Sequence, residues 1–230
     1  MAEFTPASVK EVAKLIDHTI LAPSATKHQV VTVAEEALRM GAASACVQPY
    51  WVRDVADVLK GSDVLACSVV GFPQGANRFE IIAQEAERAV RDGASEIDMV
   101  MPIGLAKMGE WREVERCVRT VKAAIGDNLL KVILEVCELT DDEIITASQS
   151  AIAGGTDFIK TSTGFSKGGA TIEAVRLMAG VAAGKTGVKA AGGIRSFQDL
   201  KAMVEAGATR IGASSGLKIL EEAAAILAQS

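Results

Sequence analysis

The strongest constraint on the fold is a pattern that recurs along the chain, in which a helical segment ends at a glycine and a short apolar strand follows. Four clear copies have their strands at 44–47, 96–100, 158–160 and 210–213. Glycine readily adopts the left-handed conformation that ends a helix, and a link of two or three residues into a strand is typical of αβ units. Weaker signals predict further strands at 15–19, 64–70, 130–136 and 188–191.

Eight strands separated by helical segments indicate parallel pairing and closure into a barrel. We therefore predict an α/β fold, a single-domain (β/α)8 TIM barrel that spans residues 1–230, with an open, doubly wound sheet as the alternative. The 230 residues are enough for one such barrel, and no linker or change of composition divides them. Because aromatic residues make up 4% of the chain, the core should consist of Val, Ile, Leu and Ala, which suits a parallel sheet buried on both faces.

Composition also narrows the classes of partner. The net charge is −5 with acidic and basic residues interspersed, which argues against a nucleic-acid-binding surface but allows a local basic pocket for one phosphate. The chain has no run of about 18 apolar residues, so we expect no membrane span. The N-terminal residues lack the basic and then apolar pattern of a signal peptide, and the cytoplasm is the expected location.

The cysteines and histidines point away from disulfide and metal chemistry. The chain has four separated cysteines without a Cys-x-x-Cys pair, and two histidines without the helical spacing of metal ligands: Cys46, Cys67, Cys117, Cys137, His18 and His28. This pattern argues against a disulfide framework and against a histidine-based zinc site. We expect no metal and no other cofactor, although an all-carboxylate metal site stays open.

Two lysines stand near the ends of expected strands, Lys160 in the strand 158–160 and Lys189 in the strand 188–191. An unpaired ammonium is costly to bury, so it either finds a partner or loses its proton. Neighbouring strands lie about 4.8 Å apart, and two like charges at that distance turn one lysine into a nucleophile for Schiff-base chemistry. Spacing alone does not distinguish the two lysines, and both ammonium groups could instead reach water.

Three acidic residues also stand near the ends of expected strands. Asp98 lies between Ile97 and Met99, and strand alternation turns its carboxylate toward the barrel interior. It could act there with the two lysines, or it could instead cap a turn or pair with a surface lysine. Glu135 and Glu138 are expected to hold lysine ammonium groups in place.

Glycine-rich segments follow three of the strands and indicate a phosphate cradle. Loops after the seventh and eighth strands are the usual phosphate site of such barrels, often aided by a helix N-terminus. A single glycine doublet would more simply be a turn, so the prediction depends on several segments occurring together. The candidate residues are Thr163 and Gly164 after the sixth strand, Gly192 and Gly193 after the seventh, and Gly212, Ser214 and Ser215 after the eighth.

Six segments of the chain, taken together, carry a family resemblance. They are Asp-His-Thr-Ile-Leu at 17–21, Gly-Phe-Pro at 71–73, Glu-Ile-Asp-Met-Val at 96–100, Phe-Ile-Lys-Thr-Ser-Thr-Gly-Phe at 158–165, Lys-Ala-Ala-Gly-Gly-Ile-Arg at 189–195 and Gly-Ala-Ser-Ser at 212–215. Over nearly the whole chain they resemble the deoxyribose-phosphate aldolase family. The resemblance implies a class I aldolase that uses a lysine Schiff base in deoxyribose catabolism. Its reaction would reversibly cleave 2-deoxy-D-ribose 5-phosphate to D-glyceraldehyde 3-phosphate and acetaldehyde.

The resemblance also gives the two lysines different roles. It implies that Lys160 forms the Schiff base, that Lys189 keeps Lys160 ready to react, and that Asp98, with Lys189 and a bound water, serves the acid–base steps. Asp17 and Thr19 would help to shape the substrate site, and the glycines and serines of the cradle would bind phosphate. The family further implies a homo-oligomer, a dimer or a tetramer, with a small sugar phosphate as its ligand.

Two features depart from some members of that family. A lysine that directly follows the Thr-Ser-Thr-Gly glycine in some of them is here Phe165, with Lys167 two residues later, and the chain ends without their tyrosine-bearing tail. These changes leave phosphate affinity and substrate preference open, but not the Schiff-base step.

Two other functions remain as alternatives. One is another phosphate-binding barrel enzyme such as a sugar-phosphate isomerase, which would use carboxylates or histidine, and the other is a non-catalytic sugar-phosphate sensor.

Overall fold

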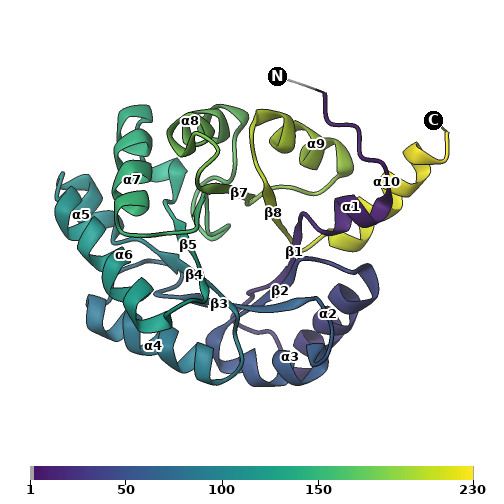
Figure 1. The fold of residues 1–230 in the computed structure, drawn as a ribbon, viewed down its shortest axis with the longest axis horizontal. Coiled ribbons are helices and arrows are strands. Elements are labelled where there is room, and N and C mark those ends of the chain that lie inside the picture. Colours follow the sequence, from purple (N-terminus) through teal and green to yellow (C-terminus); the bar gives the residue numbers. More distant parts are fainter. Residues whose placement is uncertain (1–2, 230) are drawn as a thin grey trace.

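The computed structural model describes residues 3–229 and contains a closed barrel of eight parallel strands, ordered around the barrel as they occur in the chain (Figure 1). The strands are β1 Ile16–Ile20, β2 Ser44–Val47, β3 Leu65–Val70, β4 Glu96–Val100, β5 Leu129–Ile133, β6 Phe158–Lys160, β7 Gly187–Ala191 and β8 Arg210–Ala213. Pairing of β8 with β1 closes the sheet. The predicted (β/α)8 barrel is therefore confirmed, and the alternative of an open, doubly wound sheet is wrong.

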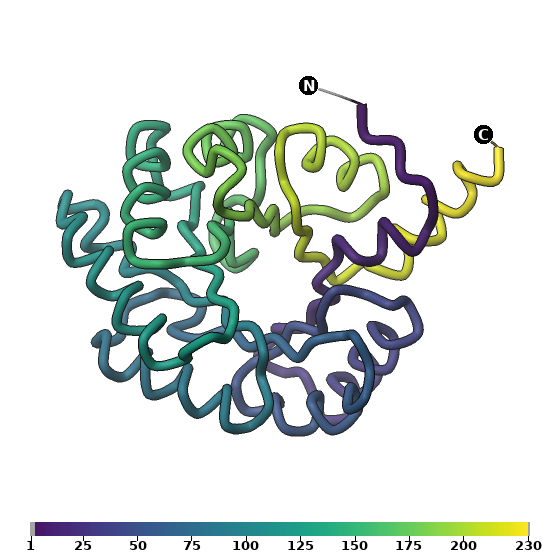
Figure 2. Tube along the Cα trace, viewed as in Figure 1, coloured from purple at the N-terminus to yellow at the C-terminus, as the bar shows by residue number. Residues whose placement is uncertain are grey.

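Helices surround the barrel, and α1 packs against α10 beside it (Figure 2). The α-helices are α1 Val9–Ala13, α2 Lys27–Met40, α3 Val52–Leu59, α4 Phe79–Arg91, α5 Ile103–Lys107, α6 Trp111–Ile125, α7 Asp141–Ala153, α8 Ile172–Ala182, α9 Phe197–Ala206 and α10 Gly216–Leu227. Two short 3-10 helices are η1 Pro49–Trp51 and η2 Val136–Glu138. Within residues 3–229, every helix is too short or too polar to cross a membrane.

Local sequence signals account for the element boundaries. Thr26 begins α2 with a capping box that includes Gln29, and Gly41 ends this helix in the left-handed conformation. Helices α7 and α9 begin with the same capping arrangement. One expected boundary is wrong, because β5 ends at Ile133 and not at residue 136. The reason is that Glu135 takes a left-handed backbone, with a φ of 57°, which turns the chain into η2.

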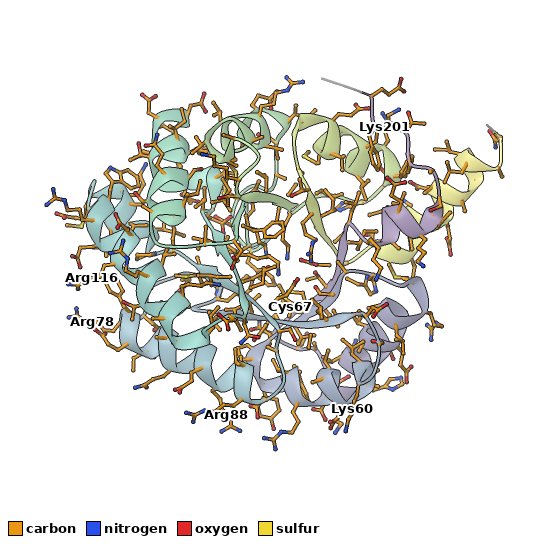
Figure 3. All side chains as sticks on the ribbon, viewed as in Figure 1. Lys60, Cys67, Arg78, Arg88, Arg116 and Lys201 are labelled. Atoms are coloured by element: carbon orange, nitrogen blue, oxygen red, sulfur yellow. The ribbon has the colours of Figure 1, made fainter. Side chains whose placement is uncertain are left out.

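Strand alternation separates an apolar outer face of the barrel from a charged interior. Ile97 points outward and is fully buried in the core that the strands form with the helices. The next residue of the same strand, Asp98, points inward and is also fully buried. Figure 3 shows Cys67 within the barrel, whereas Arg88 projects from a surrounding helix into solvent. The barrel interior is therefore where charged side chains collect.

Gly187 provides a test of how tightly the barrel wall is packed. A Cβ at this position of β7 would lie 2.2 Å from the ring of Phe158 on β6, which is much closer than a van der Waals contact. We expect Gly187→Ala to lower the free energy of unfolding by about 1–3 kcal/mol, as overpacking does. Urea denaturation followed by circular dichroism measures the change.

Gly180→Ala is the matched control for this substitution. Gly180 lies exposed in α8 with open space around its Cβ position. Alanine should therefore stabilise the helix at this position by about 0.5–1 kcal/mol. A Gly187→Ala variant as stable as the wild type would contradict the expected clash.

Candidate active site

The carboxylate of Asp98 is the centre of a charged cluster inside the barrel. Its Oδ2 atom lies 2.7 Å from Lys160 Nζ and 2.6 Å from Lys189 Nζ. Its Oδ1 atom lies 2.8 Å from Lys131 Nζ. None of these four side chains is more than 3% exposed. Three ammonium groups therefore share one carboxylate away from solvent.

Two further carboxylates support the same lysines. Asp17 Oδ2 lies 2.5 Å from Lys189 Nζ, and Asp17 Oδ1 accepts a hydrogen bond from Arg210 at 2.7 Å. Glu96 Oε2 lies 2.6 Å from Lys131 Nζ and 3.2 Å from the Arg210 guanidinium. The cluster thus extends from Asp98 to two further buried carboxylates and to the partly buried Arg210.

Strand register brings these residues together from distant parts of the chain. Lys160 on β6 is the direct neighbour of Lys189 on β7, and Asp98 on β4 is the direct neighbour of Lys131 on β5. Alternation adds Glu96, which lies two residues before Asp98 on the same face of β4. Each of these side chains is carried by a strand, which is a more precise support than a loop.

Neighbouring carboxylates decide the charge of two of the lysines. Burial disfavours the ammonium form of Lys189, but attraction by Asp17 and Asp98 outweighs burial and raises the pKa of Lys189 above its ordinary value. Burial likewise opposes the charge of Lys131, and attraction, most strongly by Asp98, raises the pKa of Lys131 well above its ordinary value. Both side chains therefore carry a positive charge at neutral pH.

The same contacts keep the carboxylates ionised. Burial alone would raise the pKa of Asp98, but the ammonium groups of Lys131, Lys160 and Lys189 hold it well below its usual value. Burial also acts against the charge of Asp17, and its cationic neighbours, of which Lys189 is the strongest, lower its pKa. The cluster consists of charged groups that stabilise one another in the absence of solvent.

The cluster holds more positive than negative charge. Among residues 3–229, its cationic side chains are four, those of Lys131, Lys160, Lys189 and Arg210. Its carboxylates are three, those of Asp17, Glu96 and Asp98. Within 4.0 Å, the ammonium of Lys131 has three carboxylate partners, that of Lys189 has two and that of Lys160 has one. Lys160 shares that one oxygen with Lys189. It is the least supported ammonium of the three.

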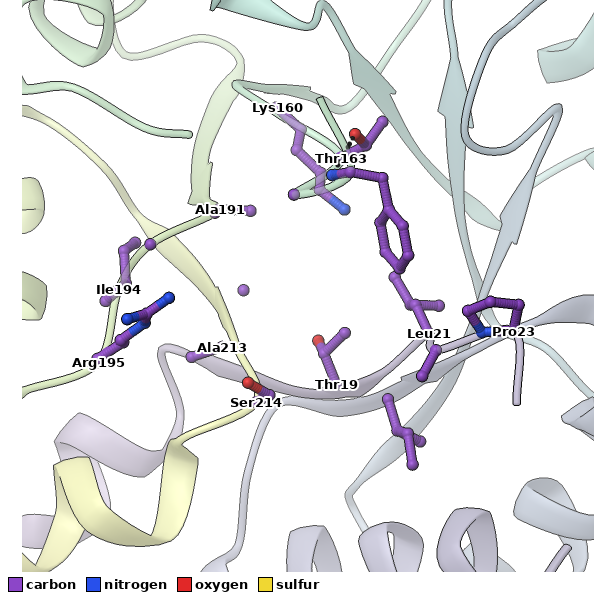
Figure 4. Close-up of a pocket in the computed structure, with 17 residues that line it drawn as sticks. Thr19, Leu21, Pro23, Lys160, Thr163, Ala191, Ile194, Arg195, Ala213 and Ser214 are labelled. Atoms are coloured by element: carbon purple, nitrogen blue, oxygen red, sulfur yellow. Dashed lines mark hydrogen bonds between the residues drawn. The ribbon is translucent and has the colours of Figure 1, made fainter. Parts of the chain in front are cut away.

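Lys160 is also the lysine that reaches open space. It lines a cavity of about 430 Å³ at the carboxyl ends of the strands, whereas Lys131 and Lys189 are fully buried outside the cavity lining. Figure 4 shows the Lys160 side chain extending into this cavity. The size suits a small ligand.

The cavity has two chemically different ends. One end, formed by the end of β8 and by the loops after β7 and β8, offers backbone groups, a hydroxyl and a guanidinium, from Gly192, Gly193, Arg195, Gly212 and Ser214. The other end is apolar and comprises Ile20, Leu21, Ala22, Pro23 and Phe165. Figure 4 shows Arg195 and Ser214 on one side of the cavity, and Leu21 and Pro23 on the other. A ligand with an anionic group at one end and an apolar segment at the other would match both.

The structure places most of the predicted binding residues on this cavity. Those that line it are Thr19, Thr163, Gly164, Gly192, Gly193, Gly212 and Ser214. Asp17 and Ser215 lie outside the lining. Asp17 is fully buried among the cations, and Ser215 stands at the N-cap position of α10. Asp17 therefore acts on the site through Lys189 and Arg210, not by facing a ligand.

Four charged residues of the site are not among those predicted from the sequence: Lys131, Glu96, Arg210 and Arg195. A signal was present for Lys131, because it lies between two apolar residues of an expected strand. Alternation, which indicates an inward Asp98, indicates an inward Lys131 as well. For Arg195 the signal was its place in the loop that carries the glycine doublet.

The two glutamates after β5 differ from each other. Glu138 lies 3.0 Å from Lys167 Nζ, so the expected ion pair is confirmed for this residue. Glu135 forms no ion pair within residues 3–229, and its carboxylate instead accepts hydrogen bonds from the backbone N–H and the hydroxyl of Thr163. The expectation that Glu135 holds an ammonium group is therefore wrong.

Cys46 and Cys67 are neighbours on β2 and β3, and their sulfur atoms lie within 4.8 Å of each other and of an Asp98 oxygen. Three such donors can bind a metal ion in other surroundings. Here three ammonium groups contact the same carboxylate and would repel a cation. The Cys67 thiol instead donates a hydrogen bond to Asp98 Oδ1 at 3.3 Å.

Known proteins share both the sequence and the fold of this chain. The profile of the DeoC/LacD family of aldolases matches residues 11–222. A Streptococcus uberis protein named deoxyribose-phosphate aldolase is 52% identical over 189 residues, which are 82% of this chain and 86% of that protein. The crystal structure of a Coccidioides immitis protein superposes with a TM-score of 0.93 at 42% identity, over 96% of this chain and 88% of that one. The tetrameric deoxyribose phosphate aldolase from Aeropyrum pernix gives a TM-score of 0.87 at 34% identity, over 96% and 94%.

The charged cluster predicts a loss of stability in acid. The pKa values of Asp98 and Asp17 are lower in the folded protein than in the unfolded chain. Both carboxylates therefore contribute fully to the free energy of unfolding above the pKa of an unfolded aspartate, about 4. This contribution is lost as the pH falls below that value. Urea denaturation should therefore give a lower free energy of unfolding at about pH 3 than at about pH 6. Asp98→Asn should flatten this fall, because the amide takes up no proton. A wild-type stability that stays constant down to about pH 3 would contradict the argument.

Lys131 and Lys160 should differ in their contribution to stability. Lys131→Met removes contacts to three buried carboxylates, a kind of change that costs about 3–5 kcal/mol. Lys160→Met removes the surplus cation and one contact, so we expect a smaller loss. Urea denaturation of both variants at neutral pH measures the difference, and equal losses would show that the charge count does not govern stability.

Proposed function

Because the chain belongs to the DeoC/LacD family of aldolases, we propose that it reversibly cleaves 2-deoxy-D-ribose 5-phosphate to D-glyceraldehyde 3-phosphate and acetaldehyde. The chain is an aldolase, and relatives that are 50% and 52% identical to it are named for this substrate. The observation that carries the proposal is one lysine amine, that of Lys160, which faces the cavity and contacts Asp98. The reaction would place the enzyme in deoxyribose catabolism.

Lys160 is the proposed nucleophile. Its neutral amine adds to the C1 aldehyde of the open-chain sugar, and loss of water gives an iminium. Asp98, acting through a bound water, then takes the proton of the C3 hydroxyl. The C2–C3 bond breaks, and its electrons move into the iminium to form an enamine as D-glyceraldehyde 3-phosphate leaves. C2 of the enamine takes up a proton, and water hydrolyses the resulting iminium, which releases acetaldehyde and restores the amine.

Asp98 and Lys189 are proposed to move the protons. Asp98 Oδ2 lies within hydrogen-bonding distance of the nitrogen atoms of both Lys160 and Lys189, so a proton that leaves one amine can pass to this oxygen. Lys189 lies on the same oxygen and assists this transfer by stabilising the negative charge of the carboxylate. Lys131 contacts the other oxygen of Asp98 and so fixes the orientation of the carboxylate.

The phosphate is proposed to bind at the glycine end of the cavity. Backbone N–H groups and a guanidinium are suited to an anion, and arginine can donate two parallel hydrogen bonds to phosphate oxygens. Arg195 would thus supply the positive charge that a lysine at position 165 supplies in some relatives. The residues proposed to contact the substrate are Thr19, Gly164, Gly192, Gly193, Arg195, Gly212 and Ser214, with Ser215 acting through the N-terminus of α10.

The chain is also proposed to form a homo-oligomer, either a dimer or a tetramer. The proposal rests on the Aeropyrum pernix relative, which is tetrameric.

Neither alternative function suits this cavity. A sugar-phosphate isomerase would need a carboxylate or histidine base that faces its substrate. Among the described residues that line the cavity, none is Asp, Glu or His. A sensor would not need three ammonium groups buried on one carboxylate, because such a cluster is costly to assemble and adds nothing to binding at the glycine end.

Borohydride reduction tests the Schiff base. In the presence of 2-deoxy-D-ribose 5-phosphate, borohydride should reduce the iminium and leave a covalent adduct on the peptide that contains Lys160, which peptide mass mapping detects. Lys160→Ala should abolish the adduct and lower the cleavage rate by about 10⁴-fold or more, as loss of a nucleophile does. Lys167→Ala is the matched control, because Lys167 is exposed and should leave labelling unchanged. An active Lys160→Ala variant would refute the mechanism.

A further inference from the structure

Glu135 occupies a backbone conformation that a residue with a side chain rarely adopts. It follows β5 with φ 57° and ψ 63°, in the left-handed region that favours glycine. Within residues 3–229, the one other non-glycine residue with positive φ is Ala183, which ends α8, where this geometry is usual. Strain of this kind persists where the surrounding structure holds it, often beside active sites.

The side chain of Glu135 is 2% exposed and has no lysine or arginine within 4.0 Å among the described residues. A buried carboxylate without a cation is costly unless hydrogen-bond donors satisfy it. Thr163 supplies these donors, since its backbone N–H donates to Oε1 at 3.2 Å and its hydroxyl donates to Oε2. The hydroxyl oxygen of Thr163 accepts in turn from the Phe165 N–H at 3.0 Å. One carboxylate therefore holds the loop from Thr163 to Phe165.

This loop forms one wall of the cavity. Thr163, Gly164 and Phe165 all line it, and a Cβ on Gly164 would lie 3.9 Å from the Cα of Gly192 on the opposite loop. Gly192 is itself packed closely, because a Cβ there would lie 2.9 Å from the Cα of Gly169. The loops after β6 and β7 thus meet backbone to backbone, and a small shift of one changes the width of the glycine end of the cavity.

We propose that Glu135 is a positioning residue that sets the loop from Thr163 to Phe165 for the phosphate end of the cavity, an inference that rests on the proposed function. Glu135 does not line the cavity, so it acts through Thr163. Thr163 donates both its N–H and its hydroxyl proton to Glu135, so neither donor is available to a ligand. Its hydroxyl oxygen instead holds the N–H of Phe165 in place. Lys160 is held separately by Asp98, so the position of the loop and the Schiff-base chemistry should separate in experiment.

Steady-state kinetics with and without the phosphate group test this proposal. The substrates are 2-deoxy-D-ribose 5-phosphate and 2-deoxy-D-ribose, each cleaved by the wild type and by Glu135→Gln. Hydrogen bonds to a charged group change an equilibrium by about 10- to 100-fold, so we expect KM for the phosphorylated substrate to rise by about tenfold or more. With 2-deoxy-D-ribose, which has no phosphate to misplace, kcat/KM should fall by about threefold or less.

Three further variants control the experiment. Glu138→Gln makes the same substitution at a half-exposed glutamate that contacts Ser166 and Lys167, the residues directly after this loop, and KM should stay within about twofold because an ion pair open to solvent contributes little. Thr163→Val removes the hydroxyl and should reproduce the rise in KM, whereas Thr163→Ser keeps the hydroxyl and should give a clearly smaller rise than Thr163→Val. The two threonine variants keep the test decisive if Glu135→Gln folds poorly.

The outcomes separate this inference from the function on which it rests. Equal losses of kcat/KM with the two substrates would overturn the positioning role of Glu135. So would an unchanged or lowered KM for the phosphorylated substrate in folded Glu135→Gln and Thr163→Val. In either case, cleavage by the wild type would still support the proposed function. A wild type that cleaves neither substrate would overturn the proposed function itself.

Discussion

The carboxylate of Asp98 is the interaction on which the rest of the site depends. Three buried ammonium groups contact its two oxygen atoms, and each charge is stable away from water only while its partners stay in place. These groups come from β4, β5, β6 and β7, and the outer members of the cluster add β1 and β8. Closure of the barrel brings these strands around one axis. The fold and the charged cluster therefore depend on each other.

The unequal number of carboxylate partners, and not the spacing of the lysines, distinguishes the proposed roles of Lys160 and Lys189. Lysines that are direct neighbours on adjacent strands would repel each other if they stood alone. Asp17 and Asp98 sit against Lys189 and raise its pKa, so the repulsion is overridden there. Lys160 has one shared oxygen and an open side toward the cavity. The ammonium of Lys189, whose pKa is raised, is therefore fully buried. The amine of Lys160, which has the fewest carboxylate contacts, lines the cavity where a ligand can reach it.

Much of this arrangement was predictable from the sequence, and the part that was not depends on register and on backbone conformation. Alternation within short strands places Asp98 inside the barrel, and the position of Lys160 and Lys189 on neighbouring strands follows from their place in the expected strands. The sequence does not reveal that Arg210 on β8 contacts Asp17 on the neighbouring strand β1, because that contact follows from closure of the barrel. The contacts of Glu135 are not predictable for a different reason. Its left-handed backbone ends β5 early and turns the side chain to Thr163, and no spacing rule indicates a positive φ at a glutamate.

The site divides chemistry from recognition, and this division explains how Phe165 can stand where some relatives have a lysine. The groups proposed to carry out the reaction are fixed on strands and contact one another, so their geometry does not depend on the loops above. Phe165 lies in one of those loops, with its ring edge-on to Phe72 at a centroid distance of 5.3 Å, and it forms part of the apolar wall. Exchange of a lysine for this ring removes a cation from the rim but leaves the contacts of Asp98 unchanged. The rim can therefore vary in what it binds while the buried charges below it keep one reaction.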